Sequence, residues 1–361
     1  MSIDSTKLKN RGYRAALLGV LILVIINSLG FGLIIKDYFN SANNIKSAQT
    51  TNVDSTQVTS ANQVGGVSLQ TNTLDNYLVY KKQLVNLVTT QDPKVALNSL
   101  ASLMKTTQFV DDNCHILAHE IGHAAFARYG DFSKSVSYQT DVCGSGYIHG
   151  LVEVYFKSIT NPGTVMLSLC TPNGGTCKHA VGHGLMYFTN NDIPSALKLC
   201  NNYTDLNSKR WCGEGVFMEN FETNTDFHSA KYLKPDQPFY PCSNQVGIYK
   251  YDCYYYSGRY LVRLNNSNYS AALTECTMIP ENSYLLTCVR GVGSVIMREN
   301  ILDPKQVEKY CATAPKDTVN SCIAGALSYY IVIENSSYNA LKNVCAKFVQ
   351  PALKLDCLKN V

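Results

Sequence analysis

The segment AALTECTMIPENSYLLTCVRG, residues 271–291, contains two cysteines that are 12 residues apart, and this spacing recurs through the second half of the chain. Ala272 lies four positions before the first cysteine, Cys276, and residues four apart share one face of a helix. An apolar residue there places Cys276 on the buried face. Gly291 follows the second cysteine, Cys288, by three positions. The segment therefore predicts two antiparallel helices joined by a disulfide.

Cysteine pairs of this kind repeat along the chain with a regular period. Five pairs have members 11 or 12 residues apart, and the first members of the last four pairs are 34 or 35 residues apart. A period near 34 residues is typical of helical hairpin repeats. Glycine after the second cysteine would let two helices approach closely enough for a bridge, whose Cα atoms must be about 4.4 to 6.8 Å apart. The predicted disulfides are Cys114–Cys143, Cys170–Cys177, Cys200–Cys212, Cys242–Cys253, Cys276–Cys288, Cys311–Cys322 and Cys345–Cys357.

The cysteine pattern resembles the disulfide-bridged Sel1-like and tetratricopeptide-like repeat architectures over about residues 190–361. The resemblance implies an all-α, solenoid-like domain of helical hairpins whose surface binds a partner. The full repeat consensus of either family is missing from the sequence.

The N-terminal part of the chain predicts a membrane anchor. Residues 15–35 are apolar with Asn27 as the only strongly polar residue, and they are long enough as a helix to cross about 30 Å of hydrocarbon. Basic residues are concentrated in residues 1–14, so the positive-inside rule places this tail in the cytoplasm and the rest of the chain outside. We therefore expect a single-pass protein of the cell membrane with an uncleaved signal anchor. A cleaved signal peptide is the alternative, although its apolar region would be shorter.

Composition supports an extracytoplasmic domain. The chain has 14 cysteines, an even number that is typical of an oxidising compartment. Metal ligation by these cysteines is an alternative, but their regular pairing favours disulfides. Residues 36–73 are polar and predict a flexible linker, 74–190 a helical region rich in histidine, and 191–361 the hairpin repeats. A net charge of +4 over 361 residues, together with this location, argues against a nucleic-acid partner.

Three histidine-bearing segments predict a metal site: CHILAHEIGH (114–123), CGSGYIHGLVE (143–153) and CKHAVGHG (177–184). Each contains two metal-binding residue types four positions apart, which is the spacing of one helical face. Imidazole and carboxylate groups bind divalent transition metals, of which we expect zinc. The predicted ligands are His119, His123, His149, Glu153, His179 and His183, and His115 continues the first row. The alternatives are histidines buried for packing alone and paired histidines that ligate a heme.

The segment AHEIGHAAF resembles the active-site helix of zincin peptidases. The resemblance implies that His119 and His123 hold zinc, that Glu120 is the general base, and that Glu153 is a third ligand. The metzincin form would need glycine and histidine where this chain has Phe126 and Tyr129. Only about forty helical residues precede the motif, whereas these peptidases place a β-sheet there. A zinc-dependent hydrolase is therefore an alternative function and not the leading one.

Alignment of the second cysteines predicts a ligand groove. The positions two and six residues beyond them carry polar side chains where a buried helix would carry leucine or valine, and the predicted groove residues are Glu214, Tyr255, Arg259 and Arg290. An extracellular protein, peptide or glycan is the expected ligand. A solvated face is the alternative interpretation. The leading function is metal binding coupled to ligand recognition, and a metal-free interaction scaffold is the other alternative.

Overall fold

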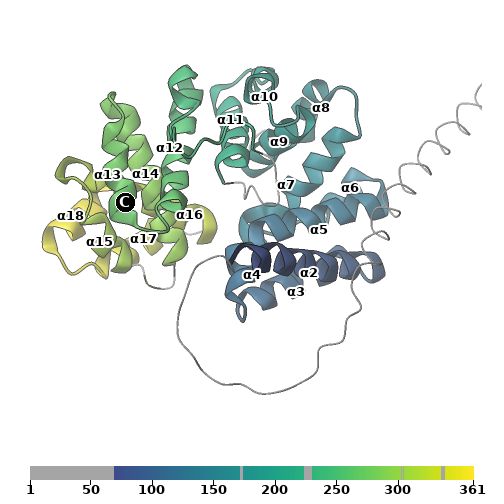
Figure 1. The fold of residues 1–361 in the computed structure, drawn as a ribbon, viewed down its shortest axis with the longest axis horizontal. Helices are drawn as coiled ribbons and strands as arrows, with labels where there is room; N and C mark the ends of the chain where they lie inside the picture. The colour runs from purple at the N-terminus through teal and green to yellow at the C-terminus, as the bar shows by residue number, and fades with distance from the viewer. Residues whose placement is uncertain (1–68, 171–173, 223–229, 302, 304, 335–337) are drawn as a thin grey trace, which may run out of the picture. The chain divides into compact units, whose positions relative to one another are not determined.

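The computed structural model describes residues 69–170, 174–222, 230–301, 303, 305–334 and 338–361 (Figure 1). These residues belong to one of the two compact units of the chain, Gly66–Val361. They form helices connected by turns, and no strand occurs in the described ranges. The predicted all-α class is therefore confirmed.

The helices fall into a longer and a shorter set. The longer helices are α2 (Leu69–Thr90), α3 (Pro93–Met104), α5 (Cys114–Tyr129), α7 (Val142–Lys157), α9 (Gly175–Phe188), α11 (Leu206–Phe221), α12 (Gly247–Leu264), α14 (Asn282–Glu299) and α16 (Val319–Glu334). The shorter helices are α4 (Gln108–Asp112), α6 (Phe132–Val136), α8 (Pro162–Leu169), α10 (Ile193–Cys200), α13 (Tyr269–Glu275), α15 (Lys305–Cys311), α17 (Tyr338–Ala346) and α18 (Pro351–Lys359). Three single 3-10 turns are η2 (Cys242–Asn244), η3 (Cys276–Met278) and η4 (Lys316–Thr318).

The predicted membrane anchor is not tested by the described structure. No helix within the described ranges is both long enough and apolar enough to cross a membrane. Residues 1–14 and 15–35 and most of the predicted linker lie outside these ranges, so the anchor and its orientation stay predictions. Helix α2 begins at Leu69, within the range 36–73 that the sequence assigned to the linker.

Helices α3 and α10 both begin with an aspartate cap that is followed by a proline. The Asp92 carboxylate accepts the backbone N–H of Val95 at 2.9 Å, and Asp192 accepts that of Ser195 at 3.1 Å. A proline occupies the first turn of both helices, α3 and α10, where its missing N–H costs no hydrogen bond. A side-chain cap of this kind stabilises a helix by about 1 kcal/mol.

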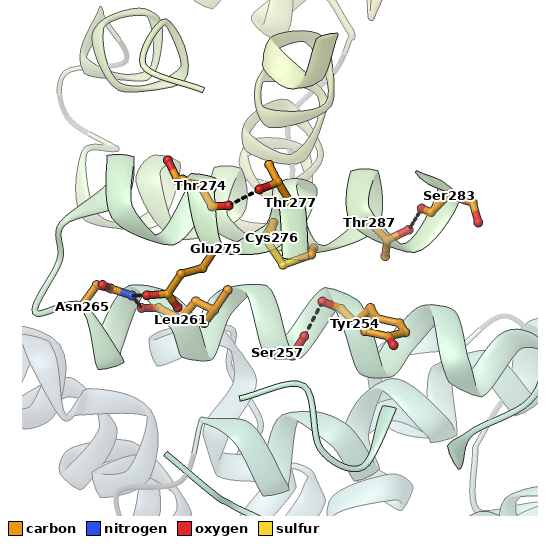
Figure 2. The surroundings of a disulfide bond; sticks show 11 residues. Tyr254, Ser257, Leu261, Asn265, Thr274, Glu275, Cys276, Thr277, Ser283 and Thr287 are labelled. Carbon is orange, nitrogen blue, oxygen red and sulfur yellow. Dashed lines mark hydrogen bonds between the residues drawn. A yellow bond between two sulfur atoms is a disulfide. The ribbon is translucent and has the colours of Figure 1, made fainter. Parts of the chain in front are cut away.

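Six of the seven predicted disulfides form. Their Cα atoms are 5.3 to 5.7 Å apart, which lies within the range that an unstrained bridge requires. Each bridge joins the end of a helix or 3-10 turn to the helix that follows. Figure 2 shows the example at Cys276, where the Asn265 amide of α12 also donates to Glu275 at 3.2 Å and so ties the hairpin to its neighbour. The cysteine spacing therefore identified the hairpins correctly.

The glycines after the second cysteines have a different role from the predicted one. A Cβ atom on Gly215 would lie less than 3.0 Å from the carbonyl oxygen of His179 in α9, and one on Gly291 equally close to that of Tyr255 in α12. These contacts join the longer helices of successive hairpins, not the two helices of one hairpin. The prediction that the glycines serve the disulfides is therefore wrong. They let successive hairpins stack backbone to backbone.

The longer helices stack in chain order. Helix α5 packs on α7, α7 on α9, and α9 on α11, and the series continues through α12, α14 and α16 (Figure 1). Within the described residues, one buried apolar cluster extends from Tyr77 to Leu151 and another from Ile148 to Cys357, so α7 contributes to both. This stacking brings residues about one repeat apart in sequence next to each other.

Candidate metal centre

Five histidines from three adjacent helices form one cluster. His115 and His119 come from α5, His149 from α7, and His179 and His183 from α9. Their ring centroids are 4.2 to 6.3 Å apart wherever two rings are in contact. Successive members of the stack therefore supply the imidazoles.

Glycine explains how the histidines come so close. A Cβ atom on Gly150 of α7 would lie less than 3.0 Å from the carbonyl oxygen of His119, and one on Gly146 would lie 2.5 Å from that of His115. The backbones of α5 and α7 therefore touch directly behind these two histidines. Side chains on the same side of both helices are then forced into contact.

The cluster contains groups of donors that could hold a metal ion. Among the described residues, three groups have one ligand atom from each member within 4.8 Å of the others: His115, His119 and His149; His149, His179 and His183; and His119, Glu153 and His183. Five of the six predicted ligands belong to these groups. The exception is His123, which belongs to none of the groups. His115 belongs to the first group instead.

Three histidines have an oxygen atom close to Nδ1, which we call the outer ring nitrogen. The contacts are His115 Nδ1 to the Cys143 carbonyl oxygen at 2.7 Å, His119 Nδ1 to Glu153 Oε1 at 2.9 Å, and His183 Nδ1 to Glu219 Oε2 at 2.6 Å. A carbonyl or carboxylate oxygen only accepts, so Nδ1 of His115 and Nδ1 of His183 carry the proton. The lone pair on Nε2 of these two histidines is then available to a metal. The His119–Glu153 contact is an ion pair, and Glu153 Oε1 has no hydrogen-bond partner among the described residues.

The inward nitrogens are spaced as metal ligands would be. His115 Nε2 is 3.1 Å from His149 Nδ1, and His183 Nε2 is 3.2 Å from His179 Nε2. Two nitrogens bound to one tetrahedral zinc ion are about 3.3 Å apart, given a Zn–N distance of about 2.0 to 2.1 Å. His119 Nε2 and His149 Nε2 are buried and have no hydrogen-bond partner among the described residues. Glu153 Oε1 likewise has no hydrogen-bond partner within the described ranges.

Burial keeps three of the imidazoles neutral. Burial, together with the neighbouring histidines, holds the pKa values of His115, His149 and His179 well below that of an exposed histidine. A metal binds the neutral imidazole, so these side chains are in the ligand form at neutral pH.

Glu153 is buried between two histidines and is 1% exposed. One oxygen contacts His119 Nδ1, and the other lies 2.7 Å from His123 Nε2. Burial would raise the pKa of Glu153, but the two histidines outweigh it and hold the pKa well below the usual value. For His123, burial would lower the pKa, but hydrogen bonds to Glu120 and Glu153 raise it to about 9. Glu153 and His123 therefore form a partly buried ion pair.

The arrangement does not match the zincin expectation. His119 and His123 do not converge on one point, because the Glu153 carboxylate bridges them with one oxygen to each. Glu120 accepts hydrogen bonds from Tyr77 and Lys81 of α2, both at 2.7 Å. Burial would raise the pKa of Glu120, but His123 and Lys81 lower it to about 2. A carboxylate held in this way is a weak general base, so the geometry gives no support to the predicted catalytic role.

The predicted Cys114–Cys143 disulfide is absent, and both cysteines are free thiols. Cys143 has a left-handed backbone with φ of 56°, as do the two residues after it, so the start of α7 is a turn unlike the other hairpins. Its Sγ is 3.3 Å from Met104 Sδ. Contact with Cys114 and burial raise the pKa of the Cys143 thiol.

The predicted groove residues lie on α11, α12 and α14, the longer helices that follow α9 in the stack. Gly215, the residue after Glu214, packs on the backbone of His179, and Gly291, the residue after Arg290, packs on the backbone of Tyr255. The three charged members already have partners within the protein. The contacts are Glu214 with Arg210 at 2.9 Å, Arg259 with Glu222, and Arg290 with the Tyr251 hydroxyl at 3.2 Å.

Two residues of the centre were not predicted. Glu219 anchors His183, and Met218 places its sulfur 3.2 Å from His179 Nε2. The signal that could have found Glu219 is the repeat period, because 36 residues separate it from His183, and 34 separate His115 from His149. A search for partners four residues apart within one helix misses contacts between helices.

No family model, curated protein or solved structure matches the chain. The chemistry of the centre is therefore the basis for a function.

Proposed function

We propose that this chain is a metal-binding protein that holds a divalent transition metal in the histidine centre of α5, α7 and α9. One observation carries the proposal: His115, His119 and His183 each have an oxygen at Nδ1, and the Nε2 atoms of His115 and His183 lie 3.1 and 3.2 Å from a nitrogen of another histidine of the cluster. Metal-binding histidines almost always donate their other N–H to a carboxylate or carbonyl in this way.

Zinc is the metal that the donor set favours. Imidazole nitrogens with a carboxylate suit zinc, copper, nickel and iron, and exclude ions that prefer oxygen ligands alone. Zinc binds three or four such donors in tetrahedral geometry, and the nitrogen spacings of 3.1 and 3.2 Å are close to what that geometry requires.

We place the metal centre outside the cell, behind the membrane anchor expected at residues 15–35. Six disulfides support an oxidising compartment. Recognition of an extracellular ligand next to the metal stays a prediction, because Glu214, Arg259 and Arg290 already have partners within the protein.

Elemental analysis tests the metal. The full chain is purified in detergent through a tag without histidine, and its zinc, copper, nickel and iron contents are measured against protein concentration. We expect zinc at one equivalent or more and no heme absorption band. A folded, disulfide-bonded protein that neither contains nor takes up any of these metals would contradict the proposal.

Two carboxylates on either side of His123 provide a matched pair of variants. Glu153 belongs to a ligand group, whereas Glu120 lies outside all three groups that the described residues form. Glu153→Gln should weaken metal affinity by at least about 10- to 100-fold, because Glu153 also contacts the ligand His119, and outer partners of ligand histidines have effects of that size. Glu120→Gln should leave affinity unchanged. Equal loss in both variants would count against the assigned ligand groups.

A further inference from the structure

We propose that the histidine centre binds two metal ions and that His149 is a ligand to both. This inference rests on the metal-binding function proposed above and adds a second site to it. One ion is bound by His115, His119 and His149. The other ion is bound by His149, His179 and His183.

The imidazole rings form two triangles. His115, His119 and His149 have centroid distances of 4.8, 5.0 and 5.5 Å. His149, His179 and His183 have centroid distances of 5.2, 4.2 and 5.1 Å. The rings of His149 and His183 are stacked with 13° between their planes, and because a metal lies in the plane of each ligand ring, one of these two rings must rotate when the second ion binds. The two triangles share one corner, His149. Each triangle supplies three nitrogen donors, which is the number of protein ligands in many zinc sites that keep a fourth position open.

One ion cannot use all five imidazoles in this arrangement. Donors on one ion lie within about 4.2 Å of each other, because each is about 2.0 to 2.1 Å from the metal. Among the described residues, no group of three donors within 4.8 Å joins His115 with His179 or His183. A single ion would leave at least two buried imidazoles without a role.

His149 has one nitrogen for each ion. Its Nδ1 lies 3.1 Å from His115 Nε2, in the first triangle. Its Nε2 lies on the other side of the ring, is buried, and has no hydrogen-bond partner among the described residues. Neutral His149 carries one N–H proton, so binding of both ions releases that proton to solvent and leaves an imidazolate between the metals.

Each triangle has its own buried carboxylate. Glu153 contacts His119 of the first triangle, and Glu219 contacts His183 of the second. Buried positive charge is costly unless negative groups lie nearby. The two carboxylates are therefore placed to compensate one ion each.

Metal titration of the full chain tests the number of sites. Metal is removed with a chelator, and Zn²⁺ is added back while bound zinc is measured after rapid desalting. We expect saturation at two equivalents. Saturation at one equivalent would overturn this inference while leaving the proposed function intact, and no binding would overturn both.

Three alanine variants test how the ligands are divided, with Glu120→Gln as the control that keeps both ions. His115→Ala and His179→Ala should each retain one equivalent, because each removes a ligand of one triangle only. His149→Ala should retain less than one, because it damages both sites. A full equivalent in His149→Ala would overturn the shared ligand. Circular dichroism and the count of disulfides verify folding.

Cu²⁺ provides a test that needs no variant. The electron paramagnetic resonance signal should grow up to one equivalent of Cu²⁺ and then fall as the second ion binds, because an imidazolate couples the two unpaired spins. A signal that grows steadily to two equivalents would show separate ions and overturn the bridge.

Discussion

His183 Nδ1 lies 2.6 Å from Glu219 Oε2, and both side chains are buried between α9 and α11. The carboxylate fixes the tautomer of His183 and turns its Nε2 toward the other histidines. Helix α11 carries no histidine, yet through Glu219 it contributes to the centre.

Glu219→Gln should weaken zinc affinity by about 10- to 100-fold, because the amide is a poorer acceptor and carries no charge. Competition with a chelator of known affinity measures the change. Glu214→Gln is the matched control on the same helix, because its partner is Arg210 and no histidine. Similar losses in both variants would mean that Glu219 acts on the stability of α11 and not on the metal.

Gly150→Ala should destabilise the protein and abolish metal binding. The added Cβ would lie less than 3.0 Å from the His119 carbonyl oxygen, so α5 and α7 must move apart. Overpacking of this kind costs about 1 to 3 kcal/mol. Urea unfolding and zinc content measure the two effects.

Gly130→Ala is the control for this substitution. Gly130 has φ of +60° and no neighbour within 4 Å, so alanine there costs about 1 to 2 kcal/mol of backbone strain and displaces nothing. Zinc content should stay at the wild-type level. Retention of zinc by Gly150→Ala would contradict the close helix contact.

Asp252→Asn should stabilise the protein at neutral pH. Asp252 is 1% exposed, and burial and the nearby Glu214 carboxylate raise its pKa well above the ordinary value of 3.8. At pH values between the pKa of Asp252 in the unfolded chain and its higher pKa in the folded protein, the folded state binds more protons than the unfolded state. The free energy of unfolding therefore falls as pH rises above about 3.8, by about 1.4 kcal/mol per pH unit within that interval.

The free energy of unfolding of the Asp252→Asn variant should not fall in this way as pH rises. Urea unfolding at pH 4 and pH 7 gives the comparison, and the advantage of the variant over the wild type should increase toward pH 7. An advantage that is the same at both pH values would show that Asp252 has an ordinary pKa in the folded state.

Alkylation of the unfolded, unreduced chain should label Cys114 and Cys143 alone, because the other cysteines form the six disulfides. Mass spectrometry of the labelled peptides identifies the sites. Complete absence of labelling would restore the seventh disulfide predicted from the spacing.

The sequence determined the local structure because its signals act over short distances. The bridged cysteines are 7 to 12 residues apart, and helix caps such as Asp92 act over three residues. Spacing alone therefore identified the helical class and six disulfides. The seventh pair, Cys114 and Cys143, is 29 residues apart, and the left-handed turn at Cys143 was not visible in the spacing.

The tertiary structure decided which histidines meet. The sequence located the centre between residues 115 and 183, but it paired histidines along one helix and so placed His123 with His119. The stack instead pairs residues across helices, about one repeat apart, as with His115 and His149. Glycine contacts such as that of Gly150 set this register. The physical reason is that helical periodicity fixes the face on which a side chain lies, whereas only the packing of one backbone against another fixes what that face meets.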